Sequence, residues 1–279
     1  MTVALDSHFT IGKLHLCCQD YVYQGWAGFP YVILADGCSS APDSDVGARL
    51  LALNARRLLP QFALAARDEA ERHARHWRLG RRIVRRAARQ VRDLGMNLSI
   101  LDATLLVAWC DGVTVYVHLY GDGCLAVRRL DGGVAAIEVE YAGNAPYYLS
   151  YQLDPERQDL YRDSIEAPAS AQRIHYLSDS GITTRRERFD APTVFSFSLA
   201  ALPTVAVATD GLRSFVDIEL SERMNLLVMA RALLDFLDTD GAFVKHQLRQ
   251  VVADYGRRNI FNLDDLSMGV FVKMDNAVG

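Results

Sequence analysis

The sequence has no stretch that approaches the roughly 20 consecutive apolar residues that a membrane-spanning helix requires. Its N-terminus has no basic segment followed by an apolar run and a small-residue cleavage site, which is the pattern of a secretory signal. We therefore expect a soluble, cytoplasmic protein that does not contact a membrane.

Cysteine is scarce and irregularly spaced. The chain has five cysteines, an odd number, and no CxxC pair, which argues against a disulfide framework and against a zinc ribbon. The signatures HExxH, GxSxG and GxxxxGKS/T are also missing, which excludes the common zinc protease, serine hydrolase and P-loop nucleotidase sites. The formal net charge of −4 gives the chain no general attraction to nucleic acid.

Hydrophobic side chains make up 50% of the 279 residues, so the chain can bury a large core. It has no Pro/Gly/Ser-rich linker, no internal repeat and no low-complexity tract. We expect a single domain over residues 1–279. Residues 140–200, where no hydrophobic period persists, are a candidate flap or inserted lobe.

Strand and helix periods alternate along the chain. Residues 103–139 are rich in β-branched and aromatic residues, are interrupted by Asp-Gly turns, and predict an antiparallel meander. Helical spacing follows residue 45 and recurs over residues 69–94, 221–237 and 242–255. The pattern predicts an α+β fold in which helices pack on antiparallel sheets.

The helix predicted over residues 69–94 is densely basic. An apolar stripe that includes Trp77 and Val84 runs along it, and arginines fill most of the remaining surface. We expect these arginines, together with His73 and His76, to form a solvated face. The alternative for the arginines is a surface that binds a phosphorylated or acidic partner, and the alternative for His73 and His76 is a metal clamp.

The chain contains six Asp-Gly dipeptides, and Asp-Gly is first of all a turn signal. Hairpin or helix–helix turns account for those at Asp111, Asp131 and Asp240. Those at Asp36 and Asp210 instead follow apolar runs and lead towards helices. A carboxylate at the mouth of a buried strand is costly unless a cation, a donor or water meets it. The residues alone leave a structural and a functional role equally open for this pair.

Further acidic residues share this setting. Asp20 lies within a β-like run, and Asp264, with Asp265, precedes the last predicted strand. Asp122 follows a long apolar run, although a hairpin turn explains it equally well. Carboxylates gathered at strand ends repel one another, and hard divalent cations bound through oxygen relieve that repulsion. Magnesium or manganese suits an all-oxygen site better than zinc does.

The order of these motifs resembles that of the metal-dependent protein phosphatases of type 2C. The matching segments are, in chain order, CCQD at 17–20, LADG at 34–37, ATLLVAW at 103–109, YGDG at 120–123, ATDGL at 208–212 and DDLS at 264–267. Each motif is short, but the ordered set covers nearly the whole chain. The resemblance implies two packed antiparallel β-sheets flanked by pairs of antiparallel helices.

The resemblance also implies a ligand set for two Mg²⁺ or Mn²⁺ ions. Asp36 would bridge the two ions, and Gly37 would offer its backbone carbonyl. Asp210 and Asp264 would hold the first ion, and Asp20 would reach the second through bound water.

Asp122 matches the family position that supports a third, weaker ion. The implied chemistry is hydrolysis of phosphoserine or phosphothreonine in proteins, with Asp36 and Asp210 as the residues on which catalysis depends. Two ions would share a water, lower its pKa and present hydroxide to the phosphoester. The implied partners are a phosphorylated protein substrate and a partner kinase, in a bacterial-type signalling setting.

The chain departs from the family pattern where phosphate is recognised. His15 stands at the position of the usual phosphate-binding arginine, and Lys13 is nearby. Cys38, followed by two serines, stands where the family often has histidine or a small residue before Gly-Gly. We expect an active enzyme with altered phosphate recognition. The alternative is a catalytically impaired pseudophosphatase that binds a partner or a phosphopeptide.

Overall fold

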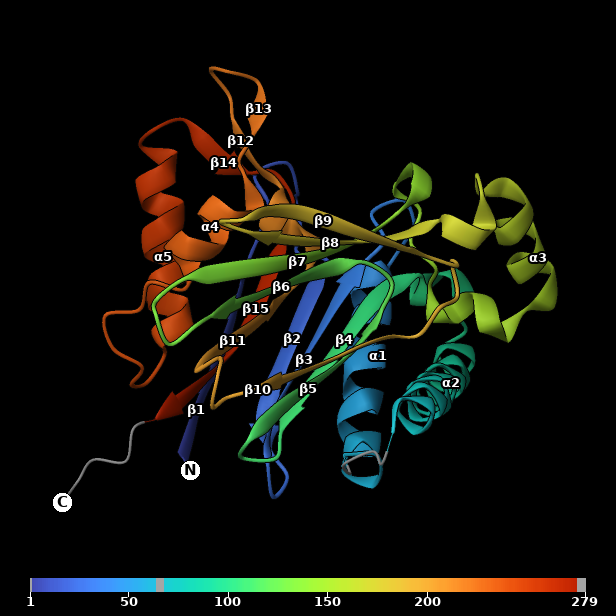
Figure 1. Cartoon of the computed structure of the whole chain (residues 1–279). Helices are drawn as coiled ribbons and strands as arrows, with labels where there is room; N and C mark the ends of the chain where they lie inside the picture. Colours follow the sequence, from blue (N-terminus) through green and yellow to red (C-terminus); the bar gives the residue numbers. More distant parts are fainter. Residues whose placement is uncertain (1, 64–67, 275–279) are drawn as a thin grey trace.

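The computed structural model describes residues 2–63 and 68–274 (Figure 1). Its strands form two large sheets and one small sheet, and every strand pair within the described residues is antiparallel. In this part of the chain, no helix is both long enough and apolar enough to cross a membrane.

The seven-stranded sheet contains, in spatial order, β1 (Thr2–Thr10), β15 (Leu266–Met274), β11 (Thr204–Ala208), β6 (Gly123–Arg128), β7 (Val134–Tyr141), β8 (Gln172–Ser178) and β9 (Gly181–Glu187). The five-stranded sheet contains β10 (Thr193–Ser198), β5 (Thr114–Tyr120), β4 (Ala103–Cys110), β3 (Pro30–Gly37) and β2 (Asp20–Trp26). The small sheet contains β13 (Glu222–Arg223), β12 (Phe215–Asp217) and β14 (Ile260–Asn262).

The two large sheets pack face to face through alternate residues of their strands. Val32 and Leu34 of β3 belong to the core between the sheets, whereas Ile33 belongs to the core under the helices. The sheets approach closely where Gly269 of β15 meets Val32, because a Cβ atom on Gly269 would lie 2.5 Å from Val32 Cγ2. Both faces of β3 are therefore buried, which explains why its sequence is a continuous apolar run.

Helices cover the outer faces of this sandwich (Figure 1). Helices α1 (Ser44–Leu58) and α2 (Glu69–Asp93) pack on the five-stranded sheet. Helices α4 (Leu226–Leu233) and α5 (Phe243–Gly256) pack on the seven-stranded sheet. The structure thus confirms the predicted fold class of two packed antiparallel sheets flanked by helices.

The predicted meander over residues 103–139 is only partly correct. The pairs β4–β5 and β6–β7 are hairpins, but β5 and β6 belong to different sheets. Gly121 and Gly123 have φ angles of 96° and 152°, a backbone region that glycine adopts at low cost. The chain crosses between the sheets here, so the hairpin explanation of Asp122 is wrong.

The helix predicted over residues 221–237 is shorter at both ends, since α4 runs from Leu226 to Leu233, and Asn225 caps its start. The Oδ1 atom of Asn225 accepts hydrogen bonds from the backbone N–H of Leu227 (2.8 Å) and of Val228 (3.4 Å). A side-chain cap of this kind satisfies donors that have no partner within a helix. The residues before it include β13 of the small sheet.

The segment 140–200 contributes three strands and a lobe. Strands β8, β9 and β10 complete the two large sheets, and residues 142–171 form a lobe that contains helix α3 (Pro155–Ser164). The lobe is fixed to the entry of β4 by Asp102, which accepts hydrogen bonds from Ser150 Oγ (2.6 Å) and Arg157 Nη2 (2.7 Å). Aromatic contacts fill its interior, and they involve Tyr147, Tyr151, Tyr161 and Phe189.

The prediction that His76 lies on a solvated face is wrong. His76 is 1% exposed, its ring stacks on Tyr120 with 4.1 Å between centroids, and its Nδ1 lies 3.1 Å from Nδ1 of His118. The buried face of α2 is therefore wider than its apolar stripe indicates. Most of the arginines do remain exposed, as expected.

Two buried, neutral histidines make the fold sensitive to acid. Burial lowers the pKa of His118 to about 3, and burial together with the neighbouring His118 lowers that of His76 well below its usual value. Below about pH 6.5 the unfolded chain binds protons that the folded chain does not. The contribution of these two histidines to stability is therefore complete above that pH and is lost as the pH falls below it, by up to about 1.4 kcal/mol per pH unit for each histidine.

In the double variant His76→Phe/His118→Phe, we expect this acid-dependent loss to shrink, because both titrating groups are replaced by rings of similar shape. Urea unfolding between about pH 7 and pH 4 measures the slope. His73→Gln, on the more exposed side of the same helix, should keep the wild-type slope. Equal slopes in the wild type and the double variant would contradict the assignment.

Candidate metal centre

A cavity of about 200 Å³, the metal cavity, is lined by Asp36, Asp122, Asp210 and Asp264, together with Gly37. Asp36 and Gly37 end β3, and Asp122 lies in the crossing between β5 and β6. Asp210 begins the 3₁₀ helix η6 (Asp210–Arg213) just after β11, and Asp264 shortly precedes β15. The fold thus brings five of the six predicted metal ligands, all except Asp20, from distant parts of the sequence to one cavity.

Asp20 and Asp36 lie directly opposite each other in the β2–β3 ladder. Like charges in such a pair destabilise a sheet. Burial raises the pKa of both carboxyl groups, and the charge of Asp20 raises that of Asp36 further. One oxygen of Asp20, Oδ2, accepts a hydrogen bond from Thr209 Oγ1 (2.9 Å), whereas Oδ1 is buried without a hydrogen-bond partner.

His15 lies against the acidic pair that precedes β15. Its Nε2 is 3.4 Å from Asp264 Oδ1, and its Nδ1 is 3.1 Å from Asp265 Oδ2. Partial burial lowers the pKa of His15, but the nearby carboxylates of Asp265, Asp264 and Asp20 raise it more, so the net shift is upward. Asp265 also accepts hydrogen bonds from the backbone N–H of Gly12 (2.8 Å) and Gln19 (2.6 Å), and so fixes the loop that leads to Asp20.

Lys13, the second residue predicted to bind phosphate, is directed elsewhere. Its Nζ lies 5.2 Å from the centre of the Phe261 ring. Neither Lys13 nor His15 is among the described residues that line the metal cavity. Cys38 and the two serines after it line the cavity instead, together with Asn144 and Tyr148.

Arg213 is a part of this site to which the motif patterns do not point. Its side chain is 14% exposed, and its Nη1 donates hydrogen bonds to Glu138 (3.0 Å) and Glu140 (3.4 Å). Its Nη2 lies 3.5 Å from Asp210 Oδ2 and 3.9 Å from Asp122 Oδ2. Burial lowers the pKa of Arg213, but the charges of Asp210 and Asp122 raise it more, so the guanidinium stays protonated. The available signal was a cation placed directly after Asp-Gly-Leu.

The residues present fit hard divalent cations. The acidic side chains offer only oxygen atoms, which magnesium and manganese prefer. Burial and the charges of the other carboxylates raise the pKa of Asp36, and a buried oxygen of Asp20 has no partner. Within residues 2–63 and 68–274, no three His, Cys, Asp or Glu side chains are grouped closely enough to hold one ion together. The carboxylates that line the cavity are therefore farther from one another than three side chains that together hold one ion would be.

The fold is that of bacterial serine/threonine phosphatases. The structure matches Stp1 of Staphylococcus aureus with a TM-score of 0.56 and 11% identity, over 99% of this chain and 96% of that one. It matches PstP/Ppp of Mycobacterium tuberculosis with a TM-score of 0.56 and 17% identity, over 99% and 100% of the two chains. The catalytic domain of PstP in complex with 2 manganese ions matches with a TM-score of 0.53 and 16% identity, over 98% and 100%.

The family assignment rests on the sequence. The profile of the family described as protein phosphatase 2C matches residues 12–253, and the chain belongs to this family. A search of curated proteins finds no match. The family match confirms the resemblance that the order of the motifs indicates.

Replacing Arg213 tests how strongly the acidic side chains of this site repel one another. In Arg213→Met without added metal, we expect the free energy of unfolding to fall by about 2–3 kcal/mol, because four carboxylates lose a largely buried cation. Urea unfolding in a metal-free buffer measures this loss. Arg89→Met, which removes an exposed arginine of α2, should change stability by less than about 0.5 kcal/mol. Equal stability of the two variants would contradict this role of Arg213.

Proposed function

We propose that this chain is a divalent-metal-dependent phosphatase that hydrolyses phosphoserine or phosphothreonine in proteins. The observation that carries the proposal is the convergence of four carboxylates, from Asp36, Asp122, Asp210 and Asp264, on one cavity. Membership of the protein phosphatase 2C family supports it. The manganese-bound structure of PstP, which shares the fold, supports a divalent metal as the cofactor.

The proposed ligands supply oxygen atoms only. Mg²⁺ or Mn²⁺ ions bound there would act as Lewis acids that lower the pKa of a water molecule and screen the charge of the phosphoryl group. The charges of Asp20 and of the cavity carboxylates all act on Asp36, so Asp36 would be the bridging ligand, and Asp122 would hold the weaker third ion. The full proposed set is Asp20, Asp36, Gly37, Asp122, Asp210 and Asp264.

Asn144 and Tyr148, which line the metal cavity, supply hydrogen-bond donors for a phosphoryl group. Asn144 Oδ1 accepts a hydrogen bond from Arg213 Nη2 (2.7 Å), which leaves the amide N–H groups of Asn144 free to donate. Burial raises the pKa of Tyr148, so its phenol keeps a proton to donate. We infer that Asn144, oriented by Arg213, and Tyr148 take over part of the phosphate binding that an arginine at position 15 performs in relatives.

A second candidate function rests on His15 and Arg213. Both side chains lie against carboxylates that would otherwise face metal ions, because His15 approaches Asp264 and Arg213 approaches Asp210. A protein with these pairs intact could bind a phosphopeptide or a partner kinase without hydrolysing it. Metal binding and turnover must therefore be measured separately.

Asp36→Asn should abolish both metal binding and hydrolysis, because it removes the proposed bridging charge. With Mn²⁺ at about 100 times its dissociation constant, we expect the wild type to gain roughly 2.7 kcal/mol of stability and to hydrolyse p-nitrophenyl phosphate. Asp131→Asn makes the same change at the exposed β6–β7 turn and should retain both properties. A wild type stabilised by Mn²⁺ but inactive over a wide pH range would support the binding-module alternative.

Restoring arginine at position 15 tests whether phosphate recognition is the altered step. In His15→Arg, we expect kcat/KM for a phosphoserine peptide to rise at least about tenfold, equivalent to about 1.4 kcal/mol of transition-state binding. Lys13→Arg, at the neighbouring position directed to Phe261, should give no such gain. Phosphopeptide binding without turnover in either form would contradict the proposal and favour the pseudophosphatase.

A further inference from the structure

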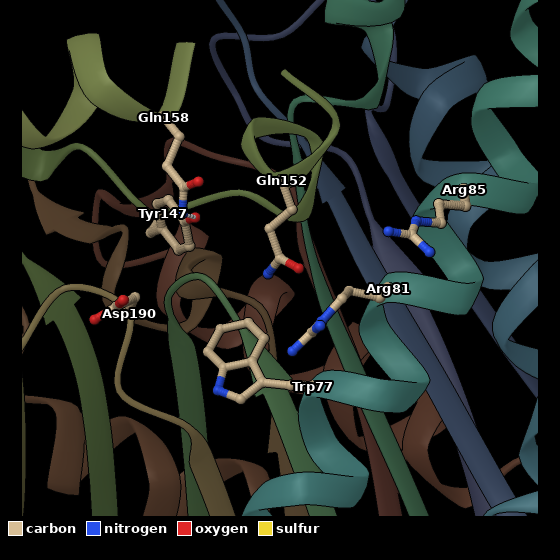
Figure 2. A pocket seen from close by; sticks show the side chains of 7 residues that line it. All are labelled: Trp77, Arg81, Arg85, Tyr147, Gln152, Gln158 and Asp190. Atoms are coloured by element: carbon tan, nitrogen blue, oxygen red, sulfur yellow. Dashed lines mark hydrogen bonds between the residues drawn. The ribbon is translucent and has the colours of Figure 1, made fainter. Parts of the chain in front are cut away.

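A second cavity, of about 350 Å³, lies between α2 and the lobe (Figure 2). We call it the arginine cavity because α2 contributes Arg81 and Arg85 to it, beside Trp77. Among the described residues, none lines both this cavity and the metal cavity. The two are nevertheless close along the chain, because Tyr147 lines the arginine cavity and Tyr148 lines the metal cavity.

The arginine cavity carries an excess of positive charge. Arg81 and Arg85 lie one turn apart on α2, a spacing at which like charges destabilise a helix. Within the described residues, neither side chain has an ion pair or a hydrogen bond. The carboxylate of Asp190 also lines the cavity, but both of its oxygens accept hydrogen bonds from Arg188. An anion that enters the cavity would therefore meet two guanidinium groups whose charge nothing else balances.

Neutral donors complete the lining. Figure 2 shows Arg81, Gln152 and the indole of Trp77 directed into the same space. The hydroxyl of Tyr147 accepts a hydrogen bond from Gln158 Nε2 (2.7 Å), which leaves its own proton available to donate. Burial raises the pKa of Tyr147 to about 12, so that proton is retained at neutral pH.

The aromatic part of the wall is held in place by packing. The ring of Trp77 meets that of His76 edge-on at 4.8 Å, and Tyr147 packs against Phe189 at 5.0 Å and Tyr161 at 5.2 Å. The cavity is therefore largely formed before any ligand enters. A volume of about 350 Å³ exceeds that of a lone phosphate ion and falls in the range of small-ligand pockets.

We propose that the arginine cavity binds the phosphate of a phosphate monoester without hydrolysing it. Guanidinium forks match the oxygens of phosphate, and such charge-assisted hydrogen bonds are the strong ones. Asp190 is the one carboxylate in the described lining, and Arg188 holds it, so the cavity offers no metal centre of its own. The monoester is either a phosphorylated side chain of a protein or a small free ester, which share this chemistry.

Binding to metal-free protein tests the proposal separately from phosphatase activity. The full chain is stripped of metal and dialysed, so that no chelator competes as an anion, and is titrated calorimetrically with inorganic phosphate and with phenyl phosphate. We expect Arg81→Gln/Arg85→Gln to weaken binding at least about tenfold, or about 1.4 kcal/mol. Arg86→Gln/Arg89→Gln removes two exposed charges from the same helix outside the cavity and should change binding less than about twofold.

A wild type that binds neither probe, or equal dissociation constants in all three proteins, would overturn the proposal. A phosphoserine peptide and its unphosphorylated form then identify the source. Binding of the phosphopeptide that depends on Arg81 and Arg85 supports the site and assigns it to phosphoproteins. Binding of the two small probes alone supports the site and assigns it to a free ester. Loss of Mn²⁺-dependent hydrolysis would leave all of these results unchanged, so the two proposals fail independently.

Discussion

Mutual repulsion among buried carboxylates is the constraint on which the rest of the site depends. Asp20 and Asp36 face each other across β2 and β3, and the acids beside β11 and β15 meet them from the other sheet. Polar contacts hold this arrangement in place. Ser214, for example, donates a hydrogen bond from Oγ to the carbonyl of Gly211 (2.8 Å) and accepts one from the N–H of Asp264 (3.2 Å). It thus connects the two acidic segments of the seven-stranded sheet.

Arg213 reduces the negative charge that bound metal ions would have to balance for the fold to be stable. In a cluster without an internal cation, bound ions would be the main means of balancing the negative charge. Here a protonated guanidinium already lies near Asp122 and Asp210. A side chain of the protein itself therefore balances part of the negative charge. The same residue orients Asn144 at the cavity wall. Charge balance and the shape of the proposed phosphate site are therefore coupled through one side chain.

Sequence patterns predicted the parts of this protein that depend on local order. An apolar run that ends in Asp-Gly before a helix can be read directly, and the structure places Asp36 and Asp210 on one cavity. The burial of His76 could not be read in this way, because it depends on His118 and Tyr120 of another element. The sheet crossing at Asp122 could not be predicted either, because Asp-Gly occurs both in hairpins and where the chain crosses between sheets. Roles of individual ligands remain predictions.

The two large sheets each carry part of the proposed ligand set. Asp20 and Asp36 belong to the five-stranded sheet, whereas Asp210 and Asp264 adjoin strands of the seven-stranded sheet. The close contact of Gly269 with Val32 and the hydrogen bond from Thr209 to Asp20 fix how one sheet lies on the other. The interior of the sandwich therefore acts as the spacer that sets how far apart the two halves of the site stand. A substitution deep in the core could alter ion selectivity without touching a single ligand.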